Sequence, residues 1–176
     1  CRPSSQRVRR QYATALGYER GMLTKLRIQN YRTFEDFEFS PSKGISVLIG
    51  ENGSGKSALG EVLDLLGKFT SGAPVSECFS ARDLCRWSGR FASQFNLTFA
   101  EPVGEFEYEL RLMVDSQNLT PMVVHENVSL NGAKLYELIG GDVTLFTAAR
   151  PFTFSLDGAR SYLGIVGSKT AQATLM

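Results

Sequence analysis

One octapeptide constrains the fold of this 176-residue chain more than any other feature. Residues 50–57 read Gly-Glu-Asn-Gly-Ser-Gly-Lys-Ser, which satisfies the G-x-x-x-x-G-K-[ST] pattern of a phosphate-binding loop, or P-loop. Such a loop follows a buried strand and opens a helix. Residues 45–49 are nearly all apolar, as in a strand covered on both faces, and an apolar stripe at helical spacing runs from Leu59 to Leu66. We therefore predict an α/β fold of the P-loop NTPase type.

Each part of the motif has a physical task. The glycines permit backbone conformations that a Cβ disfavours, and they let phosphate oxygens approach the main chain. Successive N–H groups and the start of the following helix favour negative charge. Lys56 supplies a cation for the β- and γ-phosphates, and Ser57 offers a hydroxyl to Mg²⁺, which prefers oxygen ligands. The predicted cofactors are thus ATP and Mg²⁺. The predicted nucleotide-binding residues are Gly50, Glu51, Asn52, Gly53, Ser54, Gly55, Lys56 and Ser57.

The segments on either side of the loop predict further elements. Two alternating runs, one around Leu26 and one around Phe37, are typical of half-buried strands. The helix behind the loop is expected to end at Gly67 or Gly72, because glycine commonly ends helices. A short helix is expected within residues 81–87, where the pattern is weaker.

After residue 91 the apolar period changes from helical spacing to strict alternation. Residues 95–99 and 106–114 alternate and are joined by a connection that contains proline and glycine, which predicts a hairpin. The Asn-Gly pair at residues 131–132 is a strong two-residue hairpin turn. We predict an antiparallel β meander over residues 91–138, added to the P-loop core, and a further β-like stretch at residues 143–146.

Composition excludes several classes of protein. The net charge of +1 gives no case for a polyanionic partner, and no apolar run approaches the roughly 20 residues that a membrane helix needs. The odd cysteine count fits a reducing compartment, so we expect a cytoplasmic protein without a membrane partner. Cys78, Cys85 and His125 have no recognised zinc spacing, and Cys1 lies far from them in sequence.

The first 21 residues differ from the rest of the chain. They carry five arginines against one acid and lack the apolar region of a secretory signal. We expect a disordered leader, or translated sequence upstream of the true start, rather than a basic arm or a transit segment. Because the chain starts at Cys1 and not at Met, we expect a fragment or a start that is not the natural initiation site. The predicted organisation is a basic leader at 1–21 and the N-terminal part of a P-loop ATPase domain at 22–176, with a P-loop core at 22–70 and an antiparallel section at 91–138.

Hydrolysis requires groups that the loop does not supply. One acid holds Mg²⁺ through water and another group positions the attacking water. Such acids usually follow four apolar residues as Asp-Glu, a pattern that this sequence lacks; Asp142 and Asp157 are without that context. Gln94 and Gln117 have side chains suited to sensing a γ-phosphate, but nothing in their spacing selects them. The catalytic residues therefore stay unassigned.

Two motifs together resemble a known family. Residues 30–34 read Asn-Tyr-Arg-Thr-Phe between two predicted strands, and the P-loop follows as Gly-x-Asn-Gly-Ser-Gly-Lys-Ser. This arrangement resembles the start of RecF-, SMC- and OLD-like ATPases, which have heads of the ABC type and are often described as AAA family ATPases. The meander is similar to the antiparallel sheet that these heads insert after the first helix.

The resemblance implies a function. It implies an ATPase head that dimerises around ATP, with Arg32 near the nucleotide, and that acts on DNA or in phage or plasmid defence. DNA remains a partner that the sequence itself does not establish. The signature motif, the Walker B acids and the switch histidine, which lie late in such proteins, are absent here. We therefore expect ATP binding by this chain and hydrolysis by the intact protein.

Three other functions remain open on the sequence alone. An ABC transporter ATPase subunit is disfavoured by the Asn-Tyr-Arg-Thr-Phe element. A small-molecule P-loop kinase is disfavoured by the meander and by the lack of an arginine-rich lid. A non-catalytic nucleotide-binding assembly module is kept open by the missing acids.

Overall fold

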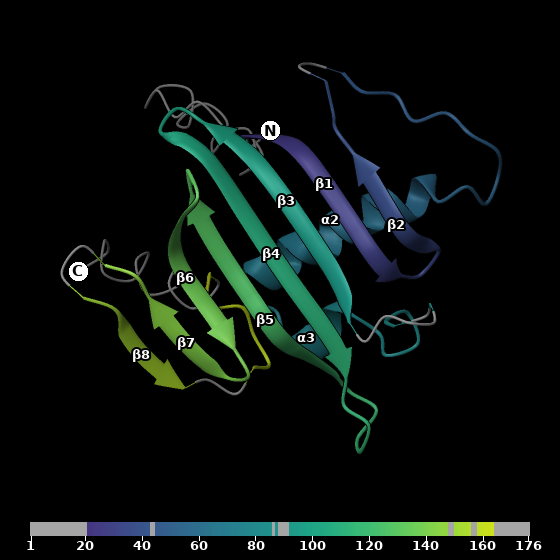
Figure 1. Ribbon diagram of the computed structural model, residues 1–176. Helices are drawn as coiled ribbons and strands as arrows, with labels where there is room; N and C mark the ends of the chain where they lie inside the picture. The colour runs from purple at the N-terminus through teal and green to yellow at the C-terminus, as the bar shows by residue number, and fades with distance from the viewer. Residues whose placement is uncertain are drawn as a thin grey trace, which may run out of the picture.

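The computed structural model describes residues 21–42, 45–85, 87, 92–147, 150–155 and 158–163. In these residues the chain forms an eight-stranded antiparallel sheet with helices on one face (Figure 1). The strands are β1 (Met22–Tyr31), β2 (Phe34–Phe39), β3 (Ser93–Glu101), β4 (Gly104–Val114), β5 (Pro121–Leu130), β6 (Ala133–Ile139), β7 (Asp142–Leu145) and β8 (Phe152–Ser155). The helices are α2 (Lys56–Thr70) and α3 (Val75–Cys78).

The sheet follows chain order except at one crossover. Its spatial order is β2-β1-β3-β4-β5-β6-β7-β8, and each neighbouring pair is antiparallel. After the β1–β2 hairpin the chain leaves the sheet, passes through the P-loop, α2 and α3, and returns as β3 on the other side of β1. The P-loop therefore lies next to the β2 end of the sheet.

The alternating patterns are confirmed in β1, β3 and β4. Leu26 and Ile28 of β1 are fully buried, and Leu26 pairs with Leu97 of β3. The predicted hairpin of β3 and β4 turns at Glu101–Gly104. Asn131 and Gly132 both adopt positive φ, 51° and 77°, as a tight hairpin turn between β5 and β6 requires. The meander predicted from residue 91 thus runs through β3, β4, β5 and β6, although residue 91 itself lies outside the described residues.

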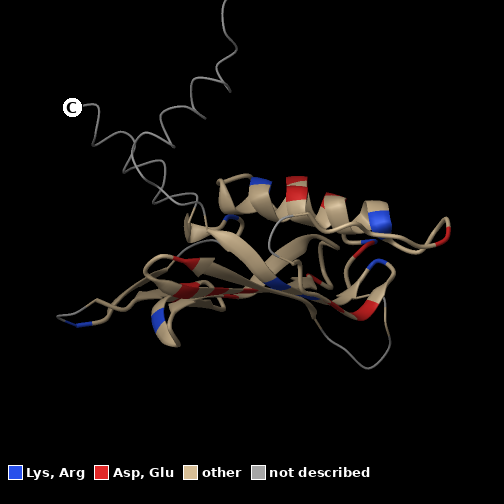
Figure 2. Cartoon of the chain, turned by 90° about the horizontal axis from the view of Figure 1, so that it is seen from above, with Lys and Arg blue, Asp and Glu red and all other residues tan. Residues whose placement is uncertain are grey.

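Helix α2 lies over one face of the sheet (Figure 2). Its predicted apolar stripe is buried in the core. Leu59, Val62 and Leu66 are buried in the core, and Phe69 extends the stripe by one turn. The helix continues through Gly67 and ends at Thr70. Ser71 is the C-cap and Gly72 follows it with a φ of 105°, which confirms the second of the two predicted ends. Neither α2 nor α3 is long and apolar enough to cross a membrane.

The expected short helix within residues 81–87 is wrong for the part that the structure describes. Residues 81–83 form a turn, and Leu84 makes an isolated bridge to Tyr31 of β1. The short helix lies earlier, at α3, which follows Pro74. Leu84 is buried, so this segment is held to the sheet by its own apolar side chain and not by helical periodicity.

The predicted buried strand at residues 45–49 is also wrong. This segment has no regular secondary structure, and Ile45 and Ile49 are 88% and 92% exposed. A strand needs a neighbour to accept and donate its backbone hydrogen bonds. The described strands all pair antiparallel with one another and none pairs with this segment. The parallel core of the predicted α/β class is therefore not seen in the described residues, whereas the P-loop helix and the antiparallel section are.

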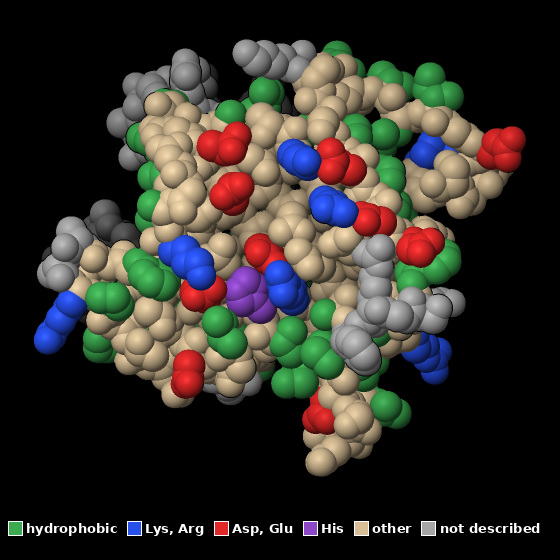
Figure 3. All heavy atoms as spheres, viewed as in Figure 1, with side chains coloured by type: hydrophobic (Ala, Val, Ile, Leu, Met, Phe, Trp, Pro, Cys, Tyr) green, Lys and Arg blue, Asp and Glu red, His purple; other side chains and the backbone are tan. Residues whose placement is uncertain are grey.

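The face of the sheet away from α2 is polar. Figure 3 shows Lys, Arg, Asp and Glu side chains gathered over the strands on this face, with the histidine among them. The ion pairs Lys25–Glu38 and Arg27–Asp36 join β1 to β2 there. Positive and negative groups alternate on this face, so it does not form a surface of one sign.

Candidate functional site

The P-loop joins the exposed segment 45–49 to the N-terminus of α2. Gly53 and Gly55 have φ angles of 86° and 92°, which side chains with a Cβ rarely adopt. A Cβ on Gly55 would also lie 3.3 Å from Cε1 of Phe34, so the loop packs closely against the start of β2. The backbone path thus favours glycine at both of these positions, and Gly55 is the motif glycine that directly precedes Lys56.

Lys56 is folded back over the loop. Its Nζ donates hydrogen bonds to the carbonyl oxygens of Gly50 and Glu51, at 2.7 and 2.6 Å, and to Ser54 Oγ at 3.2 Å. The backbone N–H of Ser54 donates to the Glu51 carbonyl at 3.2 Å, which closes the loop. The lysine cation therefore lies at the centre of the loop, where a phosphate oxygen would be a stronger acceptor than a carbonyl.

The start of α2 favours an anion. Gly55 occupies the N-cap position, makes no side-chain capping bond, and is followed by no acid in the first turn. The first bond from helix N–H to carbonyl at this end runs from Leu59 to Gly55 at 3.0 Å, so the N–H groups before it have no acceptor within the helix. Unpaired N–H groups and the positive end of the helix dipole together attract negative charge. Ser57 lies exposed on this first turn.

A hollow of about 200 Å³ adjoins the loop. One wall is apolar and comes from β2 and from Leu48 and Ile49, which directly precede the loop. The other wall is the loop itself with the start of α2. The lining residues are Phe34, Phe37, Leu48, Ile49, Gly50, Ser54, Gly55, Lys56 and Leu59. The structure thus brings together four of the predicted nucleotide-binding residues with an apolar wall that sequence reasoning did not anticipate.

Arg32 is held beside the second turn of α2. Its Nε donates to Asp83 Oδ2 at 3.0 Å, and its Nη1 donates to Glu61 Oε2. Burial opposes the charge on Arg32, but the hydrogen bonds to Glu61 and Asp83 outweigh it and raise the pKa of the guanidinium above its ordinary value. Sequence reasoning singled out Arg32 but missed both carboxylates. The sequence contained one indication that Glu61 is available to bind a partner, namely its place off the apolar stripe of the helix. No sequence pattern indicated Asp83.

The other residues considered from the sequence lie away from the loop. Gln94 contacts Asn96 and Glu109, on the opposite face of the sheet from α2. Gln117 lies in the turn between β4 and β5, where its backbone N–H donates to Asp115. Asp142 begins β7 and accepts a hydrogen bond from Ser155.

Two observations bear on the catalytic acids. Six strand spacings of about 4.8 Å separate β7 from β2, so Asp142 lies on the order of 25–30 Å from the edge next to the loop. Asp157 lies outside the described residues, as do residues 1–20 of the predicted leader. Asp142 is therefore too remote to hold a metal ion at the loop.

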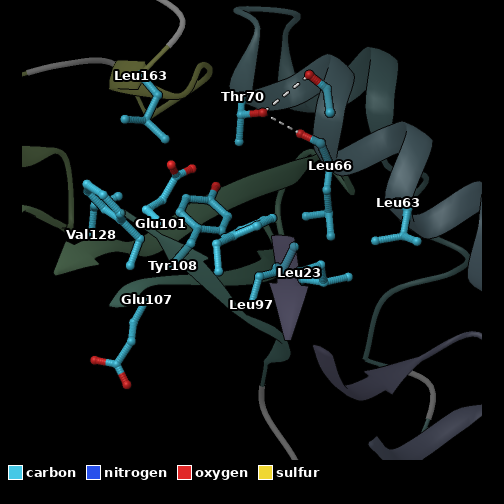
Figure 4. A pocket seen from close by; sticks show the side chains of 13 residues that line it. Leu23, Leu63, Leu66, Thr70, Leu97, Glu101, Glu107, Tyr108, Val128 and Leu163 are labelled. Carbon is cyan, nitrogen blue, oxygen red and sulfur yellow. Dashed lines mark hydrogen bonds between the residues drawn. The ribbon is translucent and has the colours of Figure 1, made fainter. Parts of the chain in front are cut away.

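A second, larger cavity has different chemistry. It measures about 660 Å³ and lies between the C-terminal half of α2 and β1, β3, β4 and β5. In Figure 4, Leu63 and Leu66 of the helix face Leu97 and Tyr108 of the sheet. Thr70 uses its hydroxyl within the helix, on the carbonyls of Leu66 and Gly67. None of the described residues that line this cavity is Lys or Arg, so it is not suited to phosphate.

Comparison with known proteins gives matches over the part of the chain that contains the P-loop. Residues 22–101, which include the P-loop, α2 and the Arg32 turn, match the family model described as an AAA ATPase domain. Among curated proteins, the chain is similar to the DNA replication and repair protein RecF. The RecF of Chlorobium luteolum is 38% identical over 74 residues, which cover 40% of this chain and 20% of that protein.

Two further RecF proteins match over more of the chain. The RecF of Prosthecochloris aestuarii is 28% identical over 126 residues, covering 72% of this chain and 29% of the relative. The RecF of Geobacillus thermodenitrificans is 26% identical over 129 residues, covering 68% and 33%. The chain thus spans about a fifth to a third of the length of these relatives. The matches confirm the resemblance to the N-terminal part of a RecF/SMC/OLD-like ATPase.

Proposed function

We propose that this chain binds ATP with Mg²⁺ through residues 50–57. The observation that carries the proposal is the position of the Lys56 ammonium, within the loop and beside a helix N-terminus that no side chain caps. The N–H groups of the loop and of the first turn of α2 would bind phosphate oxygens, together with Lys56. Ser57, exposed on that turn, would supply a hydroxyl to Mg²⁺.

The experiment is calorimetric titration of MgATP into the wild-type chain and the Lys56→Ala variant. Lys68→Ala is the matched control. Lys68 lies in the last turn of the same helix, at the other end from the loop, and its Nζ pairs with Asp64 Oδ2 at 2.7 Å. We expect binding in the wild type and the control, and loss of binding in Lys56→Ala with an unchanged circular dichroism spectrum. Equal affinity in all three proteins would refute the site.

We further propose that the chain alone binds ATP but turns it over slowly, and that the intact protein is the ATPase. Phosphoryl transfer depends on groups that position the attacking water and stabilise charge. The loop can hold the triphosphate and one side of Mg²⁺, but it carries no group that orients water. A phosphate-release assay should give turnover near background at any protein concentration. Robust turnover that Lys56→Ala abolishes would mean that this chain contains the catalytic acid.

The role of the intact protein extends this proposal. RecF relatives are named for DNA replication and repair, and on that basis we propose a DNA-related or defence function driven by ATP-dependent dimerisation. Light scattering on the intact protein tests the second part. We expect the wild-type protein to be a dimer with MgATP and the Lys56→Ala variant to stay a monomer. A wild-type protein that is a monomer both with and without MgATP would rule out ATP-driven assembly.

A further inference from the structure

Arg32 lies on a turn that packs directly against the P-loop. It follows β1 and has a φ angle of 49°, a left-handed conformation that is uncommon for a residue with a side chain. The next two residues touch the loop: a Cβ on Gly55 would lie 3.5 Å from Thr33 Oγ1 and 3.3 Å from Phe34 Cε1. The turn thus places Arg32 next to the phosphate-binding loop.

Asp83 holds this turn at two points. The backbone N–H of Arg32 donates to the Asp83 carbonyl at 2.9 Å, and Arg32 Nε donates to the Asp83 carboxylate at 3.0 Å. The side chain of Asp83 is only 25% exposed, and that of Arg32 is 27% exposed. Leu84, the next residue, is buried and bridged to Tyr31. Asp83 is therefore a fixed anchor.

Glu61 is a different kind of partner. It comes from α2, five residues after Lys56 and about 7.5 Å further along the helix axis. Its side chain contacts Arg32 Nη1 but is 58% exposed, so it can turn away into solvent at little cost. Guanidinium groups bind carboxylates and phosphates with the same forked geometry. Glu61 thus occupies a position on Arg32 that a phosphate oxygen could take.

The guanidinium also retains binding capacity. Of its N–H groups, Nε and one Nη are engaged, while Nη2 has no hydrogen-bond partner in the described part of the chain. Arg32 stays charged, since the two carboxylates raise its pKa against the effect of burial. A fixed, charged guanidinium with an exchangeable partner is suited to bind a ligand that is more negative than one carboxylate.

We propose that Asp83 is a positioning residue that anchors Arg32 for contact with the phosphates of bound ATP, and that Glu61 occupies Arg32 in competition with the nucleotide. This inference rests on the proposed function of the P-loop. It assigns opposite effects to two carboxylates on one arginine: removal of Asp83 weakens ATP binding, and removal of Glu61 strengthens it. A purely structural ion network would not produce opposite signs.

The test measures MgATP affinity by calorimetry in a small set of variants. We expect Asp83→Asn to weaken binding about tenfold, the usual effect of one charge-assisted hydrogen bond. Glu61→Gln should tighten binding about two- to fivefold, the size of an exposed ion pair. In an Arg32→Ala background, Glu61→Gln should change nothing, because its effect acts through the arginine. Asp64→Asn is the charge control, since Asp64 lies on the same helix but pairs with Lys68.

Each outcome decides the matter. If Glu61→Gln weakens MgATP binding or leaves it unchanged, the inference is overturned. The same holds if the effect of Glu61→Gln persists in the Arg32→Ala background. If Asp64→Asn tightens binding as much as Glu61→Gln, the effect is general electrostatics and the inference also fails. Should Asp83→Asn not fold, the Glu61 pair of variants decides alone. Loss of binding in Lys56→Ala shows in the same series that the P-loop site itself stands.

Discussion

A pair of glycines on either side of the P-loop lysine should respond to alanine in opposite directions. Gly55 precedes α2 with a φ of 92°, whereas Gly60 lies within α2 and has open space around the position of a Cβ. The two substitutions add the same methyl group five residues apart. Only the backbone conformation and the surroundings differ.

The magnitudes follow from these two environments. An alanine in the left-handed region costs about 1–3 kcal/mol, and at Gly55 the new Cβ would also crowd Phe34 at 3.3 Å. A glycine inside a helix is about 0.8–1.0 kcal/mol less favourable than alanine. Gly55→Ala should therefore lower the free energy of unfolding by about 1–3 kcal/mol, and Gly60→Ala should raise it by up to about 1 kcal/mol.

Urea denaturation followed by circular dichroism measures both changes on one scale. The midpoints should move in opposite directions from the wild type. MgATP binding should be lost in Gly55→Ala even where the chain is folded, because the loop N–H groups are redirected. A Gly55→Ala variant as stable as the wild type, with normal binding, would show that the loop does not need a left-handed residue at this position.

Three further perturbations test other parts of the fold. Leu66→Ala should cost about 2–5 kcal/mol in urea denaturation, because Leu66 is 3% exposed in the core; a loss below about 1 kcal/mol would mean that α2 is not packed there. Gly132→Ala should cost about 1–2 kcal/mol from its φ of 77° alone, since open space surrounds it, and an unchanged midpoint would contradict the tight hairpin turn. Glu126→Gln should change the pH dependence of stability. Burial raises the pKa of Glu126 above its ordinary value of 4.5, although hydrogen bonds from Ser161 and Tyr108 oppose this, so the wild type should lose stability relative to Glu126→Gln as the pH rises from 4.5 through the raised pKa. A stability difference that is constant between about pH 4 and about pH 7 would contradict that reading.

The parts of the fold that could be predicted depend on local patterns. The helix behind the P-loop shows helical spacing of its apolar residues, and the β3–β4 hairpin shows alternation. Both patterns lie within one short stretch of sequence. The Asn-Gly turn is equally local, because two positive φ angles in a row favour those residues. For the same reason the spacing of the motif glycines is enough to assign them to the loop.

The parts that could not be predicted depend on distant partners. Residues 45–49 have the composition of a buried strand, but a strand exists only beside another strand, and the described sheet offers it none. The burial of Glu126 in β5 depends on a residue from the neighbouring strand, because Tyr108, 18 residues away, donates to it at 2.8 Å. Asp83 lies 51 residues from Arg32, and no spacing rule connects them.

The most direct test of nucleotide binding by the P-loop is to locate the bound nucleotide on the chain. Titration of MgATP into the ¹⁵N-labelled protein reports on each backbone amide by NMR. We predict that the largest shifts fall on residues 50–57 and the first turn of α2, and that Lys56→Ala removes them. Shifts centred instead on the apolar cavity around Leu97 and Thr70, with the loop amides unmoved, would contradict this assignment.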